Sequence, residues 1–128
     1  TLNASLNPGG AAGLQVITIS EANFKLYRQR PDFIQRYVFP GGMLPTPQHL
    51  DALGKRHGLT TKSEVMFGPD YARTLRDWRS QFNGSWGNVR QLGFDERFKR
   101  LWEFYLHYCE AGFRSGYIDV RQVVFDKK

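Results

Sequence analysis

Three features of the sequence have residue types that could do chemistry, and each also has a plain structural explanation. Gln15 interrupts the otherwise apolar segment LQVITI (residues 14–19), and a buried amide needs hydrogen-bond partners or a ligand. Tyr71 stands at a predicted helix start, where it places its hydroxyl and ring face in a cleft or packs in the core. The segment from Phe39 to Pro45 contains two prolines and two glycines, which is typical of a fixed loop. Loops held by a scaffold often carry function.

The sequence contains no motif that identifies a metal, a nucleotide or a catalytic nucleophile. His49, His57 and His107 lie far apart without the HExxH spacing, and we interpret them as surface or helix-end residues. Cys109 is the single cysteine, so an internal disulfide and a Cys-rich metal site are excluded. We interpret it as a small buried hydrophobic residue. GxGxxG and GxxxxGK[ST] are absent, and Gly9-Gly10 precedes a predicted strand rather than a helix. We therefore predict no metal site.

The composition is that of one globular domain with a ring-rich core. The 128 residues are 41% hydrophobic and 15% aromatic, which argues against disorder. No apolar run approaches the roughly 18–20 residues of a membrane span. The single cysteine fits a reducing compartment and no leader pattern opens the sequence, so we expect a cytoplasmic protein. The net charge is +6, but the basic residues are scattered singly, so we predict no nucleic-acid binding.

Strands and helices that would position these residues follow from periodicity and capping signals. We predict strands at residues 14–19, 59–67 and 117–126, the first apolar enough to be covered on both faces. We also predict a helix tail at residues 1–6 and helices starting at Ser20, Thr46, Gly68 and Asp95. Residues 83–87 form a break. Three strands flanked by three or four helices make a small α/β layer with an exposed strand edge, which invites a homodimer.

Apolar stripes define which side of each predicted helix faces inward. Leu50 and Leu53 face inward on the helix that ends at Gly58. The helix from residue 68 buries Tyr71, Leu75, Trp78 and Phe82. The helix from Asp95 to about Ala111 buries Phe98, Leu101, Trp102, Tyr105 and Cys109, and Gly112 and Gly116 end it.

Four segments resemble the cyclopropane-fatty-acyl-phospholipid synthase family, in that family's order and only in its carboxy-terminal third. They are LNPGGAAGLQVITI (6–19), DFIQRYVFPGGMLPTP (32–47), DYARTLRDWRSQF (70–82) and GFDERFKRLWEFYLHYCEAGFRSGYIDVRQVVF (93–125). The resemblance implies that residues 1–128 are the C-terminal part of a Rossmann-like class I methyltransferase domain that uses S-adenosylmethionine. It implies a sheet of order 5-7-6, with residues 117–126 as an antiparallel seventh strand between the other two. The family's glycine-rich cofactor loop and acidic ribose ligand lie upstream, so we expect the chain alone to bind no S-adenosylmethionine and to be inactive.

The resemblance also implies roles for individual residues. The family transfers a methyl group to the double bond of an unsaturated lipid acyl chain, through a carbocation that loses a proton to a bound bicarbonate. Tyr71 matches the tyrosine whose hydroxyl contacts this ion, and Ile17 matches a position whose backbone contributes to the same site. Gln15 stands where many members have an ion-binding histidine. An amide donates hydrogen bonds but carries no charge, so weaker anion binding or a different product, methyl-branched or methylene, is implied. The cysteine and glutamate that complete the ion site lie upstream, and Cys109 is not that cysteine.

Two hypotheses follow. The first is a fragment of an S-adenosylmethionine-dependent lipid C-methyltransferase, with unsaturated phospholipid acyl chains as substrate and an anionic membrane surface as its docking partner. By the resemblance, the substrate path would be lined by Phe33, Tyr37, Phe39, Gly41, Gly42 and Met43. The second is a non-catalytic α/β module whose apolar groove binds lipid or a protein partner.

Overall fold

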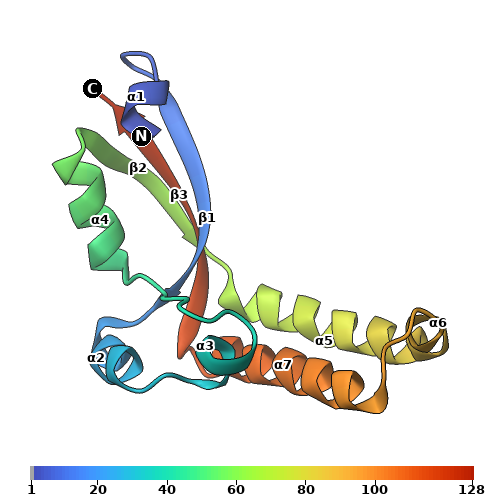
Figure 1. Ribbon diagram of the computed structural model, residues 1–128. Helices are drawn as coiled ribbons and strands as arrows, with labels where there is room; N and C mark the ends of the chain where they lie inside the picture. The colour runs from blue at the N-terminus through green and yellow to red at the C-terminus, as the bar shows by residue number, and fades with distance from the viewer. Residues whose placement is uncertain (1) are drawn as a thin grey trace. The chain divides into compact units, whose positions relative to one another are not determined.

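The computed structural model describes residues 2–128, which form two compact units (Figure 1). The sheet unit comprises residues 2–67 and 117–128, and the helical unit comprises residues 68–116. Thr1, which the sequence assigned to a helix tail, lies outside the described residues. Seven helices and three strands occur in residues 2–128, and three of the helices are no longer than six residues.

The sheet has the predicted order and directions. Strands β1 (Ala11–Ile19) and β2 (Leu59–Met66) flank β3 (Ile118–Lys127), which is antiparallel to both. The inserted antiparallel strand implied by the family resemblance is therefore confirmed. Because β3 occupies the centre, β1 and β2 are the edge strands of the sheet in the described part of the chain.

The pairing register assigns side chains to the two faces of the sheet. Leu14 pairs with Val123 and Gln15 with Gln122, so the two neighbours on β1 point to opposite faces. Helix α4 (Pro47–Arg56) packs along β2 on the face that holds Leu14 and Phe125 (Figure 1). This approach is close, because a Cβ added at Gly54 would lie 2.9 Å from the Phe125 ring.

Short helices and caps complete the sheet unit. Helix α1 (Leu2–Ser5) precedes β1, and α2 (Glu21–Gln29) and α3 (Phe33–Tyr37) follow it. The predicted cap of α4 is confirmed: the His49 N–H donates to the Thr46 hydroxyl at 3.2 Å, and Pro47 is the first helical residue. Gly58, two residues after the end of α4, has a φ of +72°, a conformation that favours glycine.

The helical unit is a hairpin of two long helices. Helices α5 (Gly68–Gly84) and α7 (Glu96–Arg114) run side by side, and α6 (Trp86–Gln91) lies in the connection between them (Figure 1). Helix α7 starts where predicted, and Asp95 caps it by accepting from the Phe98 N–H at 2.8 Å. The hairpin buries Ala72 and Leu75 of α5 against the α7 residues Leu106, Cys109 and Phe113. The predicted burial of Cys109 is confirmed.

Several local predictions were wrong. The connection after Gly84 contains helix α6, where the sequence predicted only a break. Gly112 lies inside α7, and Gly116, at a φ of +69°, is the residue that stops it. Trp78 and Leu101 are exposed rather than buried, and in α7 the buried residues lie in its C-terminal half. Leu53 faces the sheet as predicted but is 53% exposed, because it lines an open cavity.

Candidate functional site

An aromatic loop (residues 33–45) is the best-defined candidate site in the sheet unit. Its first part is α3, which starts at a complete capping box. The Gln35 N–H donates to the Asp32 carboxylate at 2.9 Å, and the Asp32 N–H donates to the Gln35 side chain at 3.0 Å. This cap fixes a helix of a single turn, on which the rings of Phe33 and Tyr37 lie 5.6 Å apart.

The second part of the aromatic loop is a turn held by hydrogen bonds. Gln35 Nε2 donates to the Gly42 carbonyl at 2.9 Å, and the Gly42 N–H donates to the Phe39 carbonyl at 2.9 Å. Gly41 has a φ of +80°, a conformation that few other residues adopt. A Cβ at Gly42 would lie 3.0 Å from the Phe39 carbonyl oxygen. The backbone of the turn therefore favours glycine at position 41, and a side chain at position 42 would require the Phe39 carbonyl to shift by a few tenths of an ångström.

Two further hydrogen bonds anchor the end of the aromatic loop to the scaffold. The Leu44 N–H donates to the Tyr27 hydroxyl of α2 at 3.2 Å. The Ile19 N–H, at the end of β1, donates to the Pro45 carbonyl at 3.0 Å. Burial raises the pKa of the Tyr27 hydroxyl, and the hydrogen bond from Leu44 partly opposes this shift. The hydroxyl is thus a neutral acceptor for the loop, and the predicted fixed loop is confirmed.

The anchored loop presents apolar side chains outward. Tyr37, Phe39 and Met43 are 66%, 58% and 51% exposed, whereas Phe33 is half-buried. A rigid segment with several large apolar side chains on its surface is typical of a binding surface rather than of a connector.

Gln15 and Ile17 share one face of β1, but Gln15 is not buried as the sequence predicted. Its side chain is exposed, and its Oε1 accepts from Gln122 Nε2 at 3.0 Å. The two amides pair with each other across neighbouring strands, and water can reach their remaining polar atoms because both side chains are exposed. Ile17 is half-buried and pairs with Val120. The strand is therefore not covered on both faces along its length.

Tyr71 belongs to the helical unit, in the first turn of α5. It is half-buried, and its ring packs edge-on against Phe113 and Trp78 at centroid distances of 5.1 and 6.1 Å. Burial raises the pKa of the nearby Tyr105 to about 12, with smaller contributions from Cys109 and from Tyr71 itself. Core packing, one of the two explanations for Tyr71 left open by the sequence, is therefore present.

A buried charge cluster joins the two long helices of the same unit. The Glu110 carboxylate is within 2.6 Å of Arg79 on α5 and 2.8 Å of Arg114 on α7. His107 Nδ1 lies 2.7 Å from Arg79 Nη1. Only 9% of the Glu110 side chain is exposed, so the two arginines compensate for the cost of taking its carboxylate out of water. The cluster is not apparent from the sequence, although Arg79 and Glu110 occur on predicted helices; Arg114 lies beyond the predicted helix end at about Ala111.

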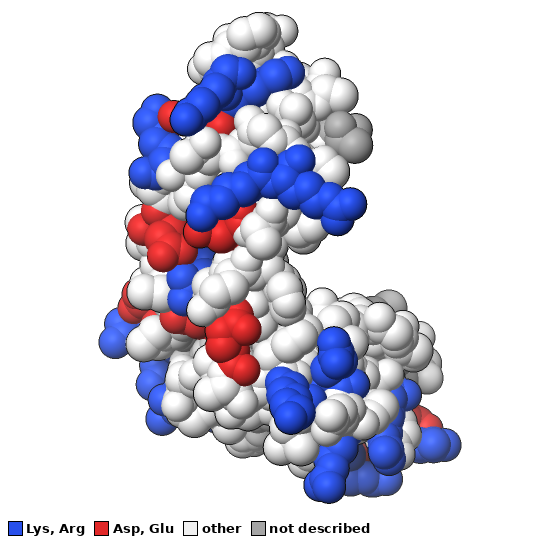
Figure 2. Space-filling view, turned by 90° about the vertical axis from the view of Figure 1, so that its left-hand side faces the viewer, with Lys and Arg blue, Asp and Glu red and all other residues white. Residues whose placement is uncertain are grey.

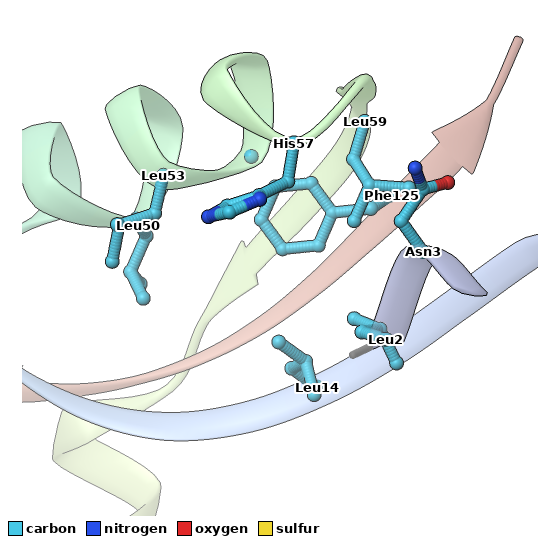
Figure 3. Close-up of a pocket in the computed structure, with 9 residues that line it drawn as sticks. Leu2, Asn3, Leu14, Leu50, Leu53, His57, Leu59 and Phe125 are labelled. Carbon is cyan, nitrogen blue, oxygen red and sulfur yellow. The ribbon is translucent and has the colours of Figure 1, made fainter. Parts of the chain in front are cut away.

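The sheet unit also contains an apolar cavity of about 230 Å³ that sequence analysis did not single out. In Figure 3, Leu50 and Leu53 extend from α4, Leu14 from β1 and Leu2 from α1 toward the same space. The ring of Phe125 forms its inner wall. Because Leu14 and Gln15 are neighbours on β1, this cavity opens on the face opposite Gln15. The only sign of this cavity in the sequence is the three-residue spacing of Leu50 and Leu53, which puts both side chains on one side of a helix.

The residues present do not form a cradle for S-adenosylmethionine. The glycines with positive φ in the described chain are Gly9, Gly41, Gly58, Gly93 and Gly116, and none connects the end of a strand to the start of a helix. Within residues 2–128, no group of three His, Cys, Asp or Glu side chains is placed to hold a metal ion. No helix among these residues is long and apolar enough to cross a membrane. Figure 2 shows Lys and Arg in several separate groups, with Asp and Glu between some of them.

Comparison with solved structures identifies the class of fold. The structure of the cyclopropane synthase MmaA2 from Mycobacterium tuberculosis matches 98% of this chain with a TM-score of 0.87 and 27% identity. The mycolic acid cyclopropane synthase CmaA1, complexed with SAH and CTAB, matches 95% with a TM-score of 0.83 and 28% identity. The chain covers 47% and 46% of these structures. The chain thus has part of the class I methyltransferase fold.

The sequence comparisons then identify the family. The family model for mycolic acid cyclopropane synthetase matches residues 1–123, and the chain belongs to this family. Tuberculostearic acid methyltransferase UfaA1 from Mycobacterium tuberculosis is 44% identical over 94% of this chain. Cyclopropane-fatty-acyl-phospholipid synthase from Escherichia coli is 34% identical over 74%. The chain spans 29% of the first relative and 24% of the second. The resemblance from the sequence motifs is therefore confirmed.

Proposed function

We propose that this chain is part of an S-adenosylmethionine-dependent lipid C-methyltransferase that adds a methyl or methylene group at the double bond of an unsaturated phospholipid acyl chain. The anchored aromatic loop, with Tyr37, Phe39 and Met43 outward, is the observation that carries the proposal. The family membership supplies the reaction class. The solved relative with CTAB, a cationic detergent with a long alkyl chain, supports an apolar chain as the ligand.

Methyl transfer to a double bond leaves a carbocation on the acyl chain, and this sets physical requirements for the site. Water must be excluded because it would trap the cation. Aromatic ring faces stabilise a nearby positive charge. In the proposed site, Phe33, Tyr37 and Phe39 supply the rings and Met43 adapts to the flexible chain. Because Gly41 and Gly42 hold a tight turn, the loop approaches the substrate without rearranging.

Gln15 and Ile17 of the sheet unit are proposed to hold the base that removes a proton from the acyl chain, with bicarbonate as that base. For Tyr71, in the helical unit, the same role is proposed from the family resemblance alone. Gln15 Oε1 accepts from Gln122, so its NH2 group is the part that donates to the anion. Ile17 would contribute through its backbone and Tyr71 through its hydroxyl. A neutral amide stabilises an anion less than a charged imidazole does. Ring closure and methylene formation each release one proton to the base, so Gln15 is proposed to change the position from which that proton is lost and to favour a methylene product. A saturated methyl-branched product would need, in addition, a hydride donor supplied by a separate reductase. The relative at 44% identity is named a methyltransferase rather than a cyclopropane synthase, which supports this choice.

The methyl donor is proposed to bind to parts of the parent protein outside this chain. The described strand ends offer no glycine-rich turn for it, so we expect no detectable binding of S-adenosylmethionine to the isolated chain. Isothermal titration measures this directly. Tight binding of S-adenosylmethionine to the isolated chain would contradict the proposal that the methyl donor binds elsewhere in the parent protein.

The test of the reaction uses the full-length parent, expressed in a bacterial host that makes unsaturated phospholipids but lacks an enzyme of this family. Mass spectrometry of the lipids should show acyl chains heavier by one CH2 unit. Tyr71→Phe should reduce this product strongly, whereas Tyr108→Phe on α7, a matched loss of a hydroxyl, should not. An unchanged acyl pool with the folded parent would refute the proposed reaction, and equal effects of both variants would refute the role of Tyr71.

The apolar cavity favours a second candidate function, a non-catalytic module that binds lipid or a protein partner. Its space of about 230 Å³ would hold part of an alkyl chain. The edge position of β1 also allows pairing with another strand, including that of a second copy. Light scattering at several concentrations tests the dimer, because edge pairing predicts a mass that rises with concentration. Fatty-acid binding that persists in the chain with Tyr37→Ala and Phe39→Ala would favour the cavity over the aromatic loop.

A further inference from the structure

We propose that the end of the α5–α7 hairpin is a membrane-docking surface that binds anionic phospholipid bilayers. This hairpin tip (residues 86–101) comprises α6, the turn after it and the first turns of α7. The choice of a bilayer as partner rests on the proposed function, because the substrate of that function is a phospholipid acyl chain. The location of the docking surface comes from the geometry below.

The hairpin tip lies at the end of the helical unit away from its chain junctions. Helix α5 starts at Gly68 and α7 is followed by Gly116, so both junctions with the sheet unit are at the other end of the hairpin. The tip turn is well ordered by hydrogen bonds: the Leu92 N–H donates to Val89 and the Gly93 N–H donates to Arg90. Gly93 has a φ of +96°, so glycine is required at this turn.

The tip turn exposes apolar side chains. Leu92 is 78% exposed, the highest value among the large hydrophobic residues of the described chain, and Phe94 is 42% exposed. Leu101, seven residues after Phe94 and in the second turn of α7, is 37% exposed. Phe94 packs against Phe98, with ring centroids 4.4 Å apart, and Phe98 stacks on Trp102 at 6.0 Å. Leu92 is therefore held by the hydrogen-bonded turn and Phe94 by a row of rings.

The charges of the hairpin tip complement an anionic surface. The tip contains four basic side chains, Arg90, Arg97, Lys99 and Arg100, and two acidic ones. Both acidic groups are engaged within the tip, because Asp95 caps α7 and Glu96 accepts from the Trp86 indole at 3.1 Å. Lys99 lies over the Trp86 ring at 5.5 Å. The three arginines are exposed, as are Asp95 and Glu96, and four basic against two acidic side chains leave the tip with a net charge of +2.

This combination distinguishes a bilayer from other partners. A short segment that carries both exposed arginines and exposed Leu and Phe matches an interface where phosphate headgroups overlie acyl chains. A nucleic acid would use the arginines but gain little from Leu92, which offers neither stacking nor a hydrogen bond. A second copy of the chain would place the arginines of both copies against one another, which is unfavourable.

The experiment measures cosedimentation of the 128-residue chain with vesicles of dimyristoyl phosphatidylcholine, with and without dimyristoyl phosphatidylglycerol. These acyl chains are saturated, so binding is measured independently of the proposed reaction. We expect binding only when phosphatidylglycerol is present. Arg90→Gln, Arg97→Gln and Arg100→Gln together should weaken it by about 100-fold, at roughly fivefold for each charge. Leu92→Ser should weaken it by roughly tenfold, for partial insertion of one leucine.

A matched control separates the hairpin tip from net charge. The control variant removes three exposed charges of α2 and the residue after it: Lys25→Gln, Arg28→Gln and Arg30→Gln. It should weaken binding by less than about threefold, because charges outside the docking surface act on the bilayer only through screened long-range attraction. Equal losses in both triple variants, binding to vesicles without phosphatidylglycerol, or no binding at all would overturn the proposal. An unaffected Leu92→Ser would also overturn it and indicate a general polyanion site. Methylation of dispersed acyl substrate by the parent reports on the proposed function separately.

Discussion

The ion pair between Arg79 and Glu110 gives a sharp test of how the helical unit is held together. The two side chains are 2.6 Å apart and only 21% and 9% exposed, and they join the two long helices. We consider Glu110→Met, which keeps the side chain close to its original size and removes its charge. In this variant the Arg79 side chain, 21% exposed, keeps only His107 as a partner, at 2.7 Å. The Arg114 side chain is 59% exposed and can turn to water.

The expected loss of stability follows from the burial of the pair. Removing one partner of a buried pair costs about 3–5 kcal/mol. Because Arg79 retains partial access to water, we expect about 2–3 kcal/mol for Glu110→Met, which lowers Tm by roughly 10 °C in a chain of this size. Urea unfolding followed by circular dichroism measures the change in the free energy of unfolding. The double variant Arg79→Met with Glu110→Met should recover more than half of the loss, since no unpaired charge remains.

The surface pair of Arg76 and Asp77 provides the control. Their charged atoms are 3.3 Å apart and about half exposed, so Asp77→Met should cost at most about 0.5 kcal/mol. The reasoning is refuted if Glu110→Met costs no more than Asp77→Met. It is also refuted if the double variant loses as much as the sum of its two single variants, because the pair would then not be coupled.

Three further predictions concern the core, the aromatic loop and high pH. Tyr105 has a pKa of about 12 in the folded chain and 10.0 as its ordinary value, so the phenol stabilises the fold below pH 10 and loses this contribution between pH 10 and 12. The pKa of Tyr27 is raised as well, so absorbance titration should show late-titrating tyrosines, and the component near pH 12 should disappear in Tyr105→Phe. Phe125→Ala should destabilise the sheet unit by about 3 kcal/mol in urea unfolding, because the ring is 3% exposed, whereas Leu53→Ala, at a 53% exposed site, should cost below about 1 kcal/mol. Gln35→Ala should accelerate hydrogen exchange at the Gly42 amide several-fold, since the turn loses the hydrogen bond that ties it to α3; unchanged exchange would show that the turn does not depend on it.

The sheet and the long helices could be predicted because local signals and global packing agree. Asp95 and Thr46 are both strong helix caps, and both start helices in the structure. The order of the strands came from the family resemblance and not from apolar patterning, which gives strand positions but no pairing. The short helix α6 was missed because its glycine and asparagine indicate a turn, while the packing of the Trp86 ring against Phe82 at 5.8 Å holds it as a helix.

Side-chain environments could be predicted less well than the elements that carry them. Gln15 illustrates this, since its apolar neighbours implied burial and the exposed cross-strand amide Gln122 is its actual partner. The partner is 107 residues away in the sequence, and only the register of two strands reveals it. Glu110 shows the reverse case: it is a charged residue on an apolar helix whose burial depends on an arginine of another helix.

The two faces of β1 divide the proposed roles within the sheet unit. Leu14 and the cavity side chains of α4 lie on one face, and Gln15 and Ile17 lie on the other. At its end the same strand holds the aromatic loop through the hydrogen bond between Ile19 and Pro45. A substitution at Leu14 therefore reports on the cavity without changing the amide of Gln15, and a substitution at Gln15 leaves the loop anchored. Neighbouring side chains on a strand point in opposite directions. Substitutions at two adjacent residues of β1 can therefore distinguish the lipid-binding function from the methyltransferase function.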